Sequence, residues 1–327
     1  MLLETNLPWE QIARRAHLGG VPPIRTVIPT DGAFVGAALA AVAAVAVAVQ
    51  SLSVRVGTDR GRTSDALVVV LFANVAAIIP AAAILYYPDY AITGRSVVAF
   101  VAAGLVGTLF GRIFYYTSIE RIGASRSEPL KASQPLHATL VAVLVLGERV
   151  TAGHVAGILL IVAGVGLISW ETARNDRANA DDIPRFALAL PLAAAFLFGI
   201  EPTLAKLGFA EGTPVLVGLA IKTAAATTGF LLYLRFKNDL PTVGDLRTSN
   251  TRWYLLAGAA NTAFLLLYYV ALSVSQVSVV VPIIQSSPLI VMILSFAFLS
   301  RLERVTWKLV AFASLVVLGA VVLTAFA

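Results

Sequence analysis

Charged side chains inside long apolar segments are the residues of this sequence best suited to chemistry. Arg112, Glu201 and Lys222 each lie well within such a segment. An ionisable group at membrane depth costs at least about 2.5–3.5 kcal/mol, so it requires a partner or a water-filled cavity. A carboxylate there can exchange a proton, whereas guanidinium and ammonium groups bind carboxylates and phosphates. We therefore expect these side chains to face a site for a small solute.

A second polar group lies in the segment near 125–146. Glu128 and Lys131 are three residues apart and share a helix face with Gln134. Pro129 and Pro135 each remove a backbone donor and should loosen this helix on the same side. A different interpretation stays open, in which Glu128 and Lys131 only neutralise each other near the water interface.

The segment near 277–299 has the same design, with Gln285 between Pro282 and Pro288. Two kinked helices with polar faces in corresponding positions are a pointer to a transport site. Tyrosines complete the set, although an interfacial aromatic belt is an equal alternative for them. The candidate substrate-binding residues are Lys222, Glu201, Arg112, Glu128, Lys131, Gln134, Asn74, Tyr115, Tyr268 and Gln285.

The embedded charges indicate the kind of solute. Four are positive and two are negative, namely Arg112, Lys131, Lys206 and Lys222 against Glu128 and Glu201. A cavity with this balance favours an anionic or zwitterionic molecule. Lys206 has an alternative role, because it lies near a helix end and its side chain can reach the interface.

Composition places these residues in a membrane protein. Of the 327 residues, 58% are hydrophobic and only 13% are charged, whereas about 25% of a soluble domain is charged. A soluble enzyme is thereby excluded. The chain has no cysteine and three scattered histidines, so no metal or other cofactor is expected. The net charge of +6 indicates contact with anionic lipids and not with nucleic acid.

Ten apolar segments are long enough to cross a bilayer, which takes about 20 residues each. They lie near 33–54, 66–86, 97–118, 125–146, 152–170, 186–209, 213–234, 253–274, 277–299 and 307–326. A tail (1–30) precedes them, and a charged linker (171–185) separates the fifth from the sixth.

The two groups of five segments are internal repeats. The tetrapeptide Glu148–Thr151 recurs at Glu303–Thr306, and the proline pair of the fourth segment recurs 153 residues later in the ninth. Because five is odd, the repeats must cross the bilayer in opposite directions. We predict an all-α integral membrane protein of ten transmembrane helices in two inverted five-helix repeats, 31–170 and 186–327.

The segment from Leu146 to Thr151 (LGERVT), followed by a helix with Gly157, Gly164 and Gly166, resembles the drug/metabolite transporter superfamily. The similarity is greatest to its EamA-type members and extends from Gly32 to the C-terminus. Leu197-Phe198-Gly199 with Lys206 also resembles the family pattern, with Phe198 in place of its usual tryptophan. The resemblance implies export or exchange of small metabolites, but it fixes no substrate.

We therefore expect a secondary transporter, without enzymatic activity, in the plasma or inner membrane. A channel or a scaffold is the alternative, and an intramembrane enzyme is a weaker one, because the sequence has no H-E-x-x-H or G-x-S-x-G motif. The sequence has no P-loop either, so ATP-driven pumping by this chain alone is unsupported. Proton coupling through Glu201 or Glu128 and plain exchange both stay open. So do a monomer and a homodimer.

Basic residues predict the orientation. Loops after odd-numbered segments hold most of the arginines and lysines, among them Arg55, Arg121 and Arg235. The positive-inside rule then places both termini outside the cytoplasm. The family resemblance favours cytoplasmic termini, and we follow the charges.

Overall fold

The computed structural model describes residues 30–58, 63–122, 127, 130–173, 185–240, 251–298 and 307–326. Four features predicted above lie partly or wholly outside these residues. They are the N-terminal tail up to residue 29, residues 174–184 of the linker, Glu128 and the repeated tetrapeptide Glu303–Thr306.

The first repeat begins with α2 (Thr30–Thr58) and α3 (Thr63–Leu85). Its third span is continuous but changes form, from α4 (Gly94–Ala103) through the π-helix η1 (Gly104–Gly111) to α5 (Arg112–Ile122). The fourth span contains α7 (Gln134–Val141) and the π-helical turn η2 (Ala142–Leu146), and the fifth is α8 (Ala152–Ala173).

The second repeat follows the same plan. A short 3₁₀ turn, η3 (Arg185–Leu188), leads into α9 (Ala189–Ala210), α10 (Val215–Phe236) and α12 (Thr251–Val274). The ninth span is divided into α13 (Val277–Ile284) and α14 (Ser287–Phe298), and α15 (Trp307–Ala325) is the tenth.

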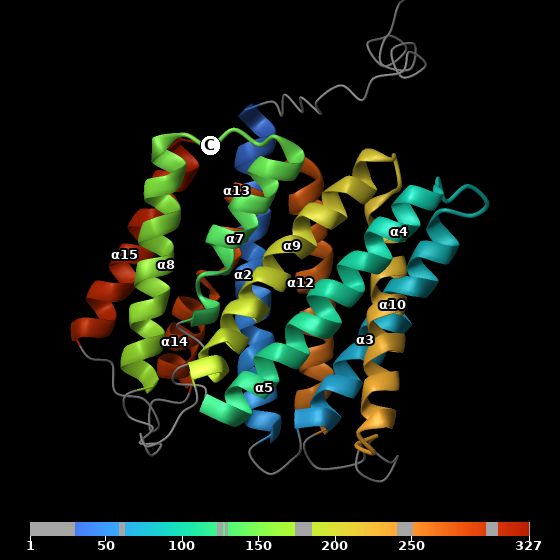
Figure 1. Ribbon diagram of the computed structural model, residues 1–327, viewed down its shortest axis with the longest axis horizontal. Helices are drawn as coiled ribbons and strands as arrows, with labels where there is room; N and C mark the ends of the chain where they lie inside the picture. The colour runs from blue at the N-terminus through green and yellow to red at the C-terminus, as the bar shows by residue number, and fades with distance from the viewer. Residues whose placement is uncertain are drawn as a thin grey trace, which may run out of the picture.

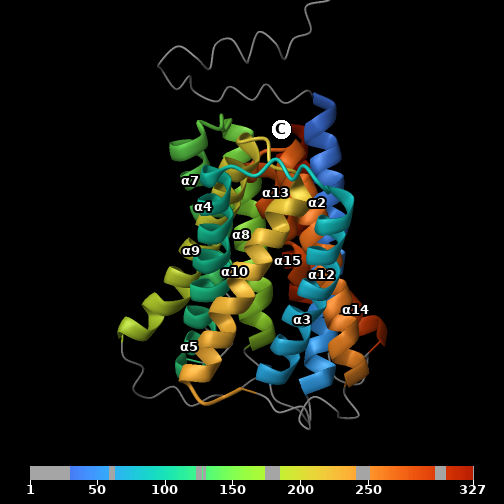
Figure 2. The ribbon, with the colours of Figure 1, turned by 90° about the vertical axis from the view of Figure 1, so that its right-hand side faces the viewer.

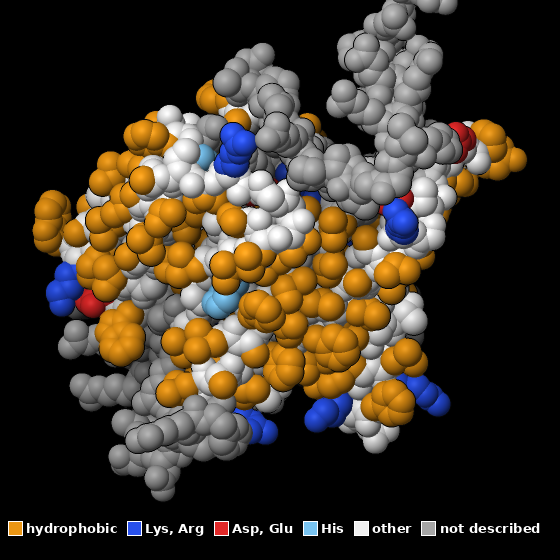
Figure 3. All heavy atoms as spheres, turned by 45° about the horizontal axis from the view of Figure 1, so that its top comes forward, with side chains coloured by type: hydrophobic (Ala, Val, Ile, Leu, Met, Phe, Trp, Pro, Cys, Tyr) orange, Lys and Arg blue, Asp and Glu red, His pale blue; other side chains and the backbone are white. Residues whose placement is uncertain are grey.

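Seven of the described helices are long and apolar enough to cross a membrane. Three shorter apolar stretches, Gln134–Leu146, Val277–Val291 and Val310–Ala325, coincide with the fourth, ninth and tenth predicted spans. Hydrophobic side chains cover much of the visible outer face of the bundle (Figure 3). The predicted all-α membrane fold is confirmed.

The two repeats run in opposite directions (Figures 1 and 2). α2 begins at the end of the bundle where α15 also ends, and we call this the terminal end. α9, the first helix of the second repeat, begins at the opposite end. That end carries Arg55, Arg121 and Arg235 in the last turns of α2, α5 and α10, and we call it the basic end.

The fourth and ninth spans are both interrupted. Turns at Ala132–Ser133 and at Gln285–Ser286 break the helices, and Pro135 and Pro288 each stand second in the helix that follows. Proline suits the first turn of a helix because it has no N–H to satisfy there. The breaks place Gln134 directly after one turn and Gln285 within the other.

Candidate substrate cavity

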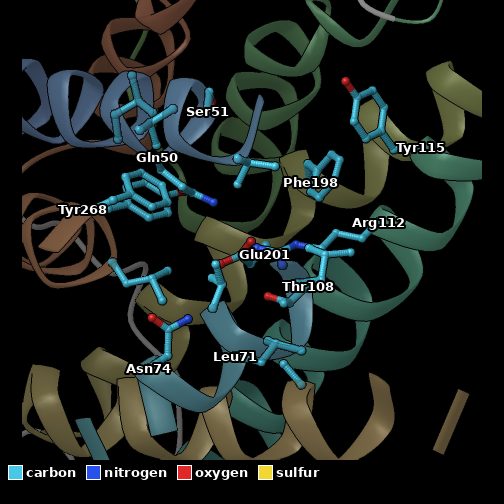
Figure 4. A pocket seen from close by; sticks show the side chains of 18 of the residues that line it. Gln50, Ser51, Leu71, Asn74, Thr108, Arg112, Tyr115, Phe198, Glu201 and Tyr268 are labelled. Carbon is cyan, nitrogen blue, oxygen red and sulfur yellow. The ribbon is translucent and has the colours of Figure 1, made fainter. Parts of the chain in front are cut away.

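A cavity of about 460 Å³ lies between the two repeats. Nine of the ten predicted site residues line it, and the tenth, Glu128, is outside the described residues. The nine are Asn74, Arg112, Tyr115, Lys131, Gln134, Glu201, Lys222, Tyr268 and Gln285. Figure 4 shows Glu201 near the centre, with Tyr268 and Asn74 on one side and Arg112 on the other.

The cavity extends toward the basic end only. Its lining includes Val54, Leu67 and Ile119, which lie within a turn or two of the ends of α2, α3 and α5 at that end. Toward the terminal end, none of the described residues 215–221 of α10 or 269–274 of α12 contributes to the lining.

Aromatic rings fill the space between the cavity and the terminal end. The ring of Phe209 packs against Phe100 at 5.3 Å and against Tyr269 at 5.8 Å, and Tyr269 packs edge-on against Tyr268 at 5.6 Å. Phe100 and Tyr269 are completely buried. Among the described residues, the cavity thus extends toward the basic end and is closed toward the terminal end.

An ion pair occupies the inner limit of the cavity. Lys222 Nζ donates to Glu201 Oε1 at 2.5 Å, and Tyr269 Oη donates to the same oxygen at 3.1 Å. The Lys222 ammonium also lies 4.8 Å from the centre of the Tyr269 ring. Glu201 and Lys222 are only 8% and 3% exposed, so each charge depends on the other for compensation.

Glycines of η1 allow this pair to sit close to the third span. A Cβ added at Gly104 would lie 2.6 Å from the Lys222 carbonyl oxygen, and one at Gly107 would lie 2.6 Å from Glu201 Oε2. Any side chain at either position would push α9 or α10 away from η1. Small residues at such contacts let membrane helices pack closely.

Arg112 and Lys131 are the other cations in the lining. Arg112 is the first residue of α5, directly after the π-helix η1, and π-helical turns frequently occur at functional sites. Arg112 forms no hydrogen bond or ion pair within the described part of the chain. Lys131 Nζ lies 4.4 Å from the centre of the Tyr115 ring, an arrangement that stabilises a cation in a partly desolvated site.

Amide side chains form the opposite wall. Asn261 accepts from Asn74 Nδ2 at 2.7 Å and donates to Gln50 Oε1 at 2.8 Å, and Thr262 Oγ1 donates to Asn74 Oδ1 at 2.8 Å. This chain of hydrogen bonds joins α2, α3 and α12. It leaves Gln50 and Asn74 in the lining with fixed orientations.

The two interrupted helices meet across the cavity. Gln285 Nε2 donates to Gln134 Oε1 at 3.1 Å, and Gln134 Nε2 reaches the Phe198 carbonyl at 3.5 Å. Gln134 directly follows the turn that breaks its helix, and Gln285 is the first residue of the other turn. The contact therefore links the repeats at the points where both helices are least regular.

Sequence reasoning missed Asn261 and did not assign Tyr269 to the site. Asn261 is uncharged, so its cost in an apolar segment is smaller than that of a charged side chain. Tyr269 stands beside Tyr268, and the sequence does not define which of the two faces the cavity. A signal for Asn261 did exist, since it is an amide in the middle of a long apolar segment.

Comparison with known proteins agrees with this geometry. Residues 34–170 and 185–325 each match the model of the EamA-like transporter family. A segment of 89 residues is 32% identical to an uncharacterized inner membrane transporter, YicL, of Salmonella typhimurium strain LT2; it covers 27% of this chain and 30% of that protein. A solved crystal structure has the same fold, with a TM-score of 0.70 and 19% identity over 89% of this chain and 99% of the other.

The family model matches each half of the chain once, and the two matches together cover most of the chain. Together with the apolar helices, it agrees with the predicted multi-pass protein of the cell membrane. The chain belongs to the EamA-like transporter family.

Proposed function

We propose that this protein is a secondary transporter for a small anionic or zwitterionic organic metabolite. The observation that carries the proposal is Arg112, a cavity-lining guanidinium without a hydrogen-bond or ion-pair partner in the described part of the chain. A guanidinium in a partly desolvated site binds carboxylate or phosphate groups through two parallel hydrogen bonds.

The charge balance of the lining supports an anion. Among the described lining residues, Arg112, Lys131 and Lys222 face a single carboxylate, Glu201. Because Glu201 and Lys222 already neutralise each other, the remaining positive field includes the guanidinium of Arg112. A solute with one or two negative charges would compensate it.

The mode of transport in this proposal is alternating access, in which the halves 31–170 and 186–327 rock against each other. The aromatic closure above Glu201 and Lys222 supports a carrier over a channel, since a carrier opens to one side at a time. The relative in Salmonella typhimurium is named an inner membrane transporter, which supports the same location for this chain.

Glu201 is the proposed coupling group. Protonation of its carboxylate would end the ion pair and release the Lys222 ammonium toward the cavity, where an anion could take the place of Glu201. Substrate anion and proton would then bind together and not in competition. Uptake into proteoliposomes with and without an imposed pH gradient tests this, because an exchanger without proton coupling would show no pH-gradient-driven uptake.

Ligand-induced stabilisation is the first test of the substrate class. The purified protein would be melted in detergent with amino acids, organic acids, phosphorylated sugars, nucleotide sugars and lipophilic cations. A ligand at 100 times its dissociation constant adds about 2.7 kcal/mol to the free energy of unfolding. We expect anionic or zwitterionic solutes to stabilise the wild type, and Arg112→Gln to lose this response.

Arg112→Gln suits this test because Arg112 has no hydrogen-bond or ion-pair partner among the described residues, so the substitution breaks no known structural contact. Glu211→Gln, which alters a partly exposed ion pair with Arg95 at the terminal end, is the control and should respond as the wild type does. Stabilisation by lipophilic cations alone would contradict the proposal and favour a cation-binding role for Glu201.

A further inference from the structure

The loop between η2 and α8 carries an acidic side chain that reaches the other repeat. Gly147 ends η2 in the left-handed conformation (φ 67°), which reverses the chain and directs Glu148 toward α13. Glu148 Oε1 accepts from the Val277 backbone N–H at 2.8 Å, and Oε2 accepts from the Ser278 backbone N–H at 3.1 Å and the Ser278 hydroxyl at 2.8 Å.

Lys206 of α9 completes the group. Its Nζ lies 3.6 Å from Glu148 Oε1 and donates to the Ser275 carbonyl at 2.6 Å. The side chains of Lys206 and Glu148 are 14% and 6% exposed. We call Glu148, Lys206 and Ser278 the Glu148 latch.

The latch lies at the closed side of the molecule. Glu148 is in the loop at the terminal end, Lys206 is close to the terminal end of α9, and Ser278 is at the start of α13. None of the three side chains lines the cavity. Glu148 comes from the first repeat, whereas every group that it contacts here belongs to the second. A carboxylate at a helix N-terminus also interacts favourably with the helix dipole.

We infer that the Glu148 latch holds the terminal end closed, and that its release is a step in opening the cavity to that side. The inference rests on the proposed alternating-access function, in which the repeats must separate at the terminal end. A contact that exists in one state only shifts the equilibrium toward that state. Weakening the latch should therefore populate the conformation that is open at the terminal end.

Cysteine labelling tests this without any substrate, because the native chain has no cysteine. Val280→Cys places a thiol on α13 two residues after Ser278, at a completely buried position. Thr108→Cys places one in the cavity lining. In the Glu148→Gln background we expect maleimide to react about tenfold faster at position 280, which corresponds to about 1.4 kcal/mol, and more slowly at position 108.

Two controls separate a latch from general damage. Ile161→Cys, buried between α8 and α15, should stay unreactive in the same background, since unfolding would expose it too. Glu211→Gln also alters an acidic contact between the repeats at the terminal end, to Thr93 and Arg95. Because Arg95 is 87% exposed, this second change should leave the rate at position 280 unaltered.

A milder variant keeps the test decisive if Glu148→Gln fails to fold. Ser278→Ala removes only the hydroxyl that donates to Glu148, and we expect a smaller rise at position 280 in the same direction. Unchanged labelling at position 280 in the folded variants, or an equal rise in Glu211→Gln, would overturn the inference. Neither result would affect the anion-binding test, so the two proposals fail separately.

Discussion

At the scale of single residues, Glu201 and Lys222 are mutually dependent, which makes their stability effects predictable. Removing one partner of a buried ion pair leaves an uncompensated charge and costs about 3–5 kcal/mol, whereas replacing both is often nearly neutral. Lys222→Met and Glu201→Gln should each lower the melting temperature strongly. The double variant should be closer to the wild type than either single variant.

Thermal unfolding of the four proteins measures this coupling as the departure from additivity. Arg95→Gln and Glu211→Gln, singly and together, form a matched cycle on an exposed pair, where the coupling should be below about 1 kcal/mol. Additive effects at Glu201 and Lys222 would mean that the pair is not formed in the folded protein.

Nine of the residues that the sequence singles out line the cavity, and there is a physical reason why a sequence can point to such residues. A charge or a strong hydrogen-bonding group in an apolar segment is costly, so it can be recognised in the sequence as a candidate site residue. The pairings were harder, because consecutive helix residues point about 100° apart and nothing in the sequence defines the rotation of one helix against another. Thus Glu201 was recognised, but its contacts with Lys222 and Tyr269 required the structure.

At the scale of elements, η1 determines how closely the third span approaches the ion pair. Gly107→Ala would place a methyl group 2.6 Å from Glu201 Cβ and Oε2, and overpacking of this kind costs about 1–3 kcal/mol. We expect a lower melting temperature, because Glu201 must move away from Lys222.

Gly166→Ala in α8 is the matched control. Nothing lies within 4 Å of a Cβ added there, so the change should raise stability by about 0.5–1 kcal/mol through helix propensity alone. If Gly107→Ala were as stable as Gly166→Ala, the close contact between η1 and α9 would be wrong.

The sequence predicted the first and last residues of the spans more accurately than it predicted the shape of each span. Apolar length predicted the ends of most helices to within a few residues, since the bilayer fixes that length. The π-helical form of η1 and η2 was not predicted, because it depends on packing between helices. The interruptions of the fourth and ninth spans were signalled by their prolines, whose missing N–H groups do not depend on context.

At the scale of the whole molecule, the inverted arrangement follows from the sequence alone, because each repeat has five spans and five is odd. The same symmetry explains why α8 and α15, the last helices of the two repeats, pack together. Gly157 and Gly319 oppose each other there, with an added Cβ on Gly157 only 2.9 Å from the Gly319 carbonyl oxygen. This pair forms one side of the bundle, away from the cavity (Figure 1).

The basic residues at one end of the bundle predict the direction in which the cavity opens. Because Arg55, Arg121 and Arg235 lie at the basic end, the positive-inside rule places that end in the cytoplasm. The state described here would then face the cytoplasm. Ser51→Cys, in the cavity lining, should react with a membrane-impermeant maleimide in inside-out vesicles and be protected in intact cells.

Tyr87→Cys provides the opposite reporter, because Tyr87 is an exposed residue in the turn after α3 at the terminal end. It should react in intact cells and be protected in inside-out vesicles. Reversal of both results would place the termini in the cytoplasm, as the family resemblance favours, and the cavity would then face outward. Because a thiol at each end is measured, a failure of one vesicle preparation cannot imitate a reversed topology.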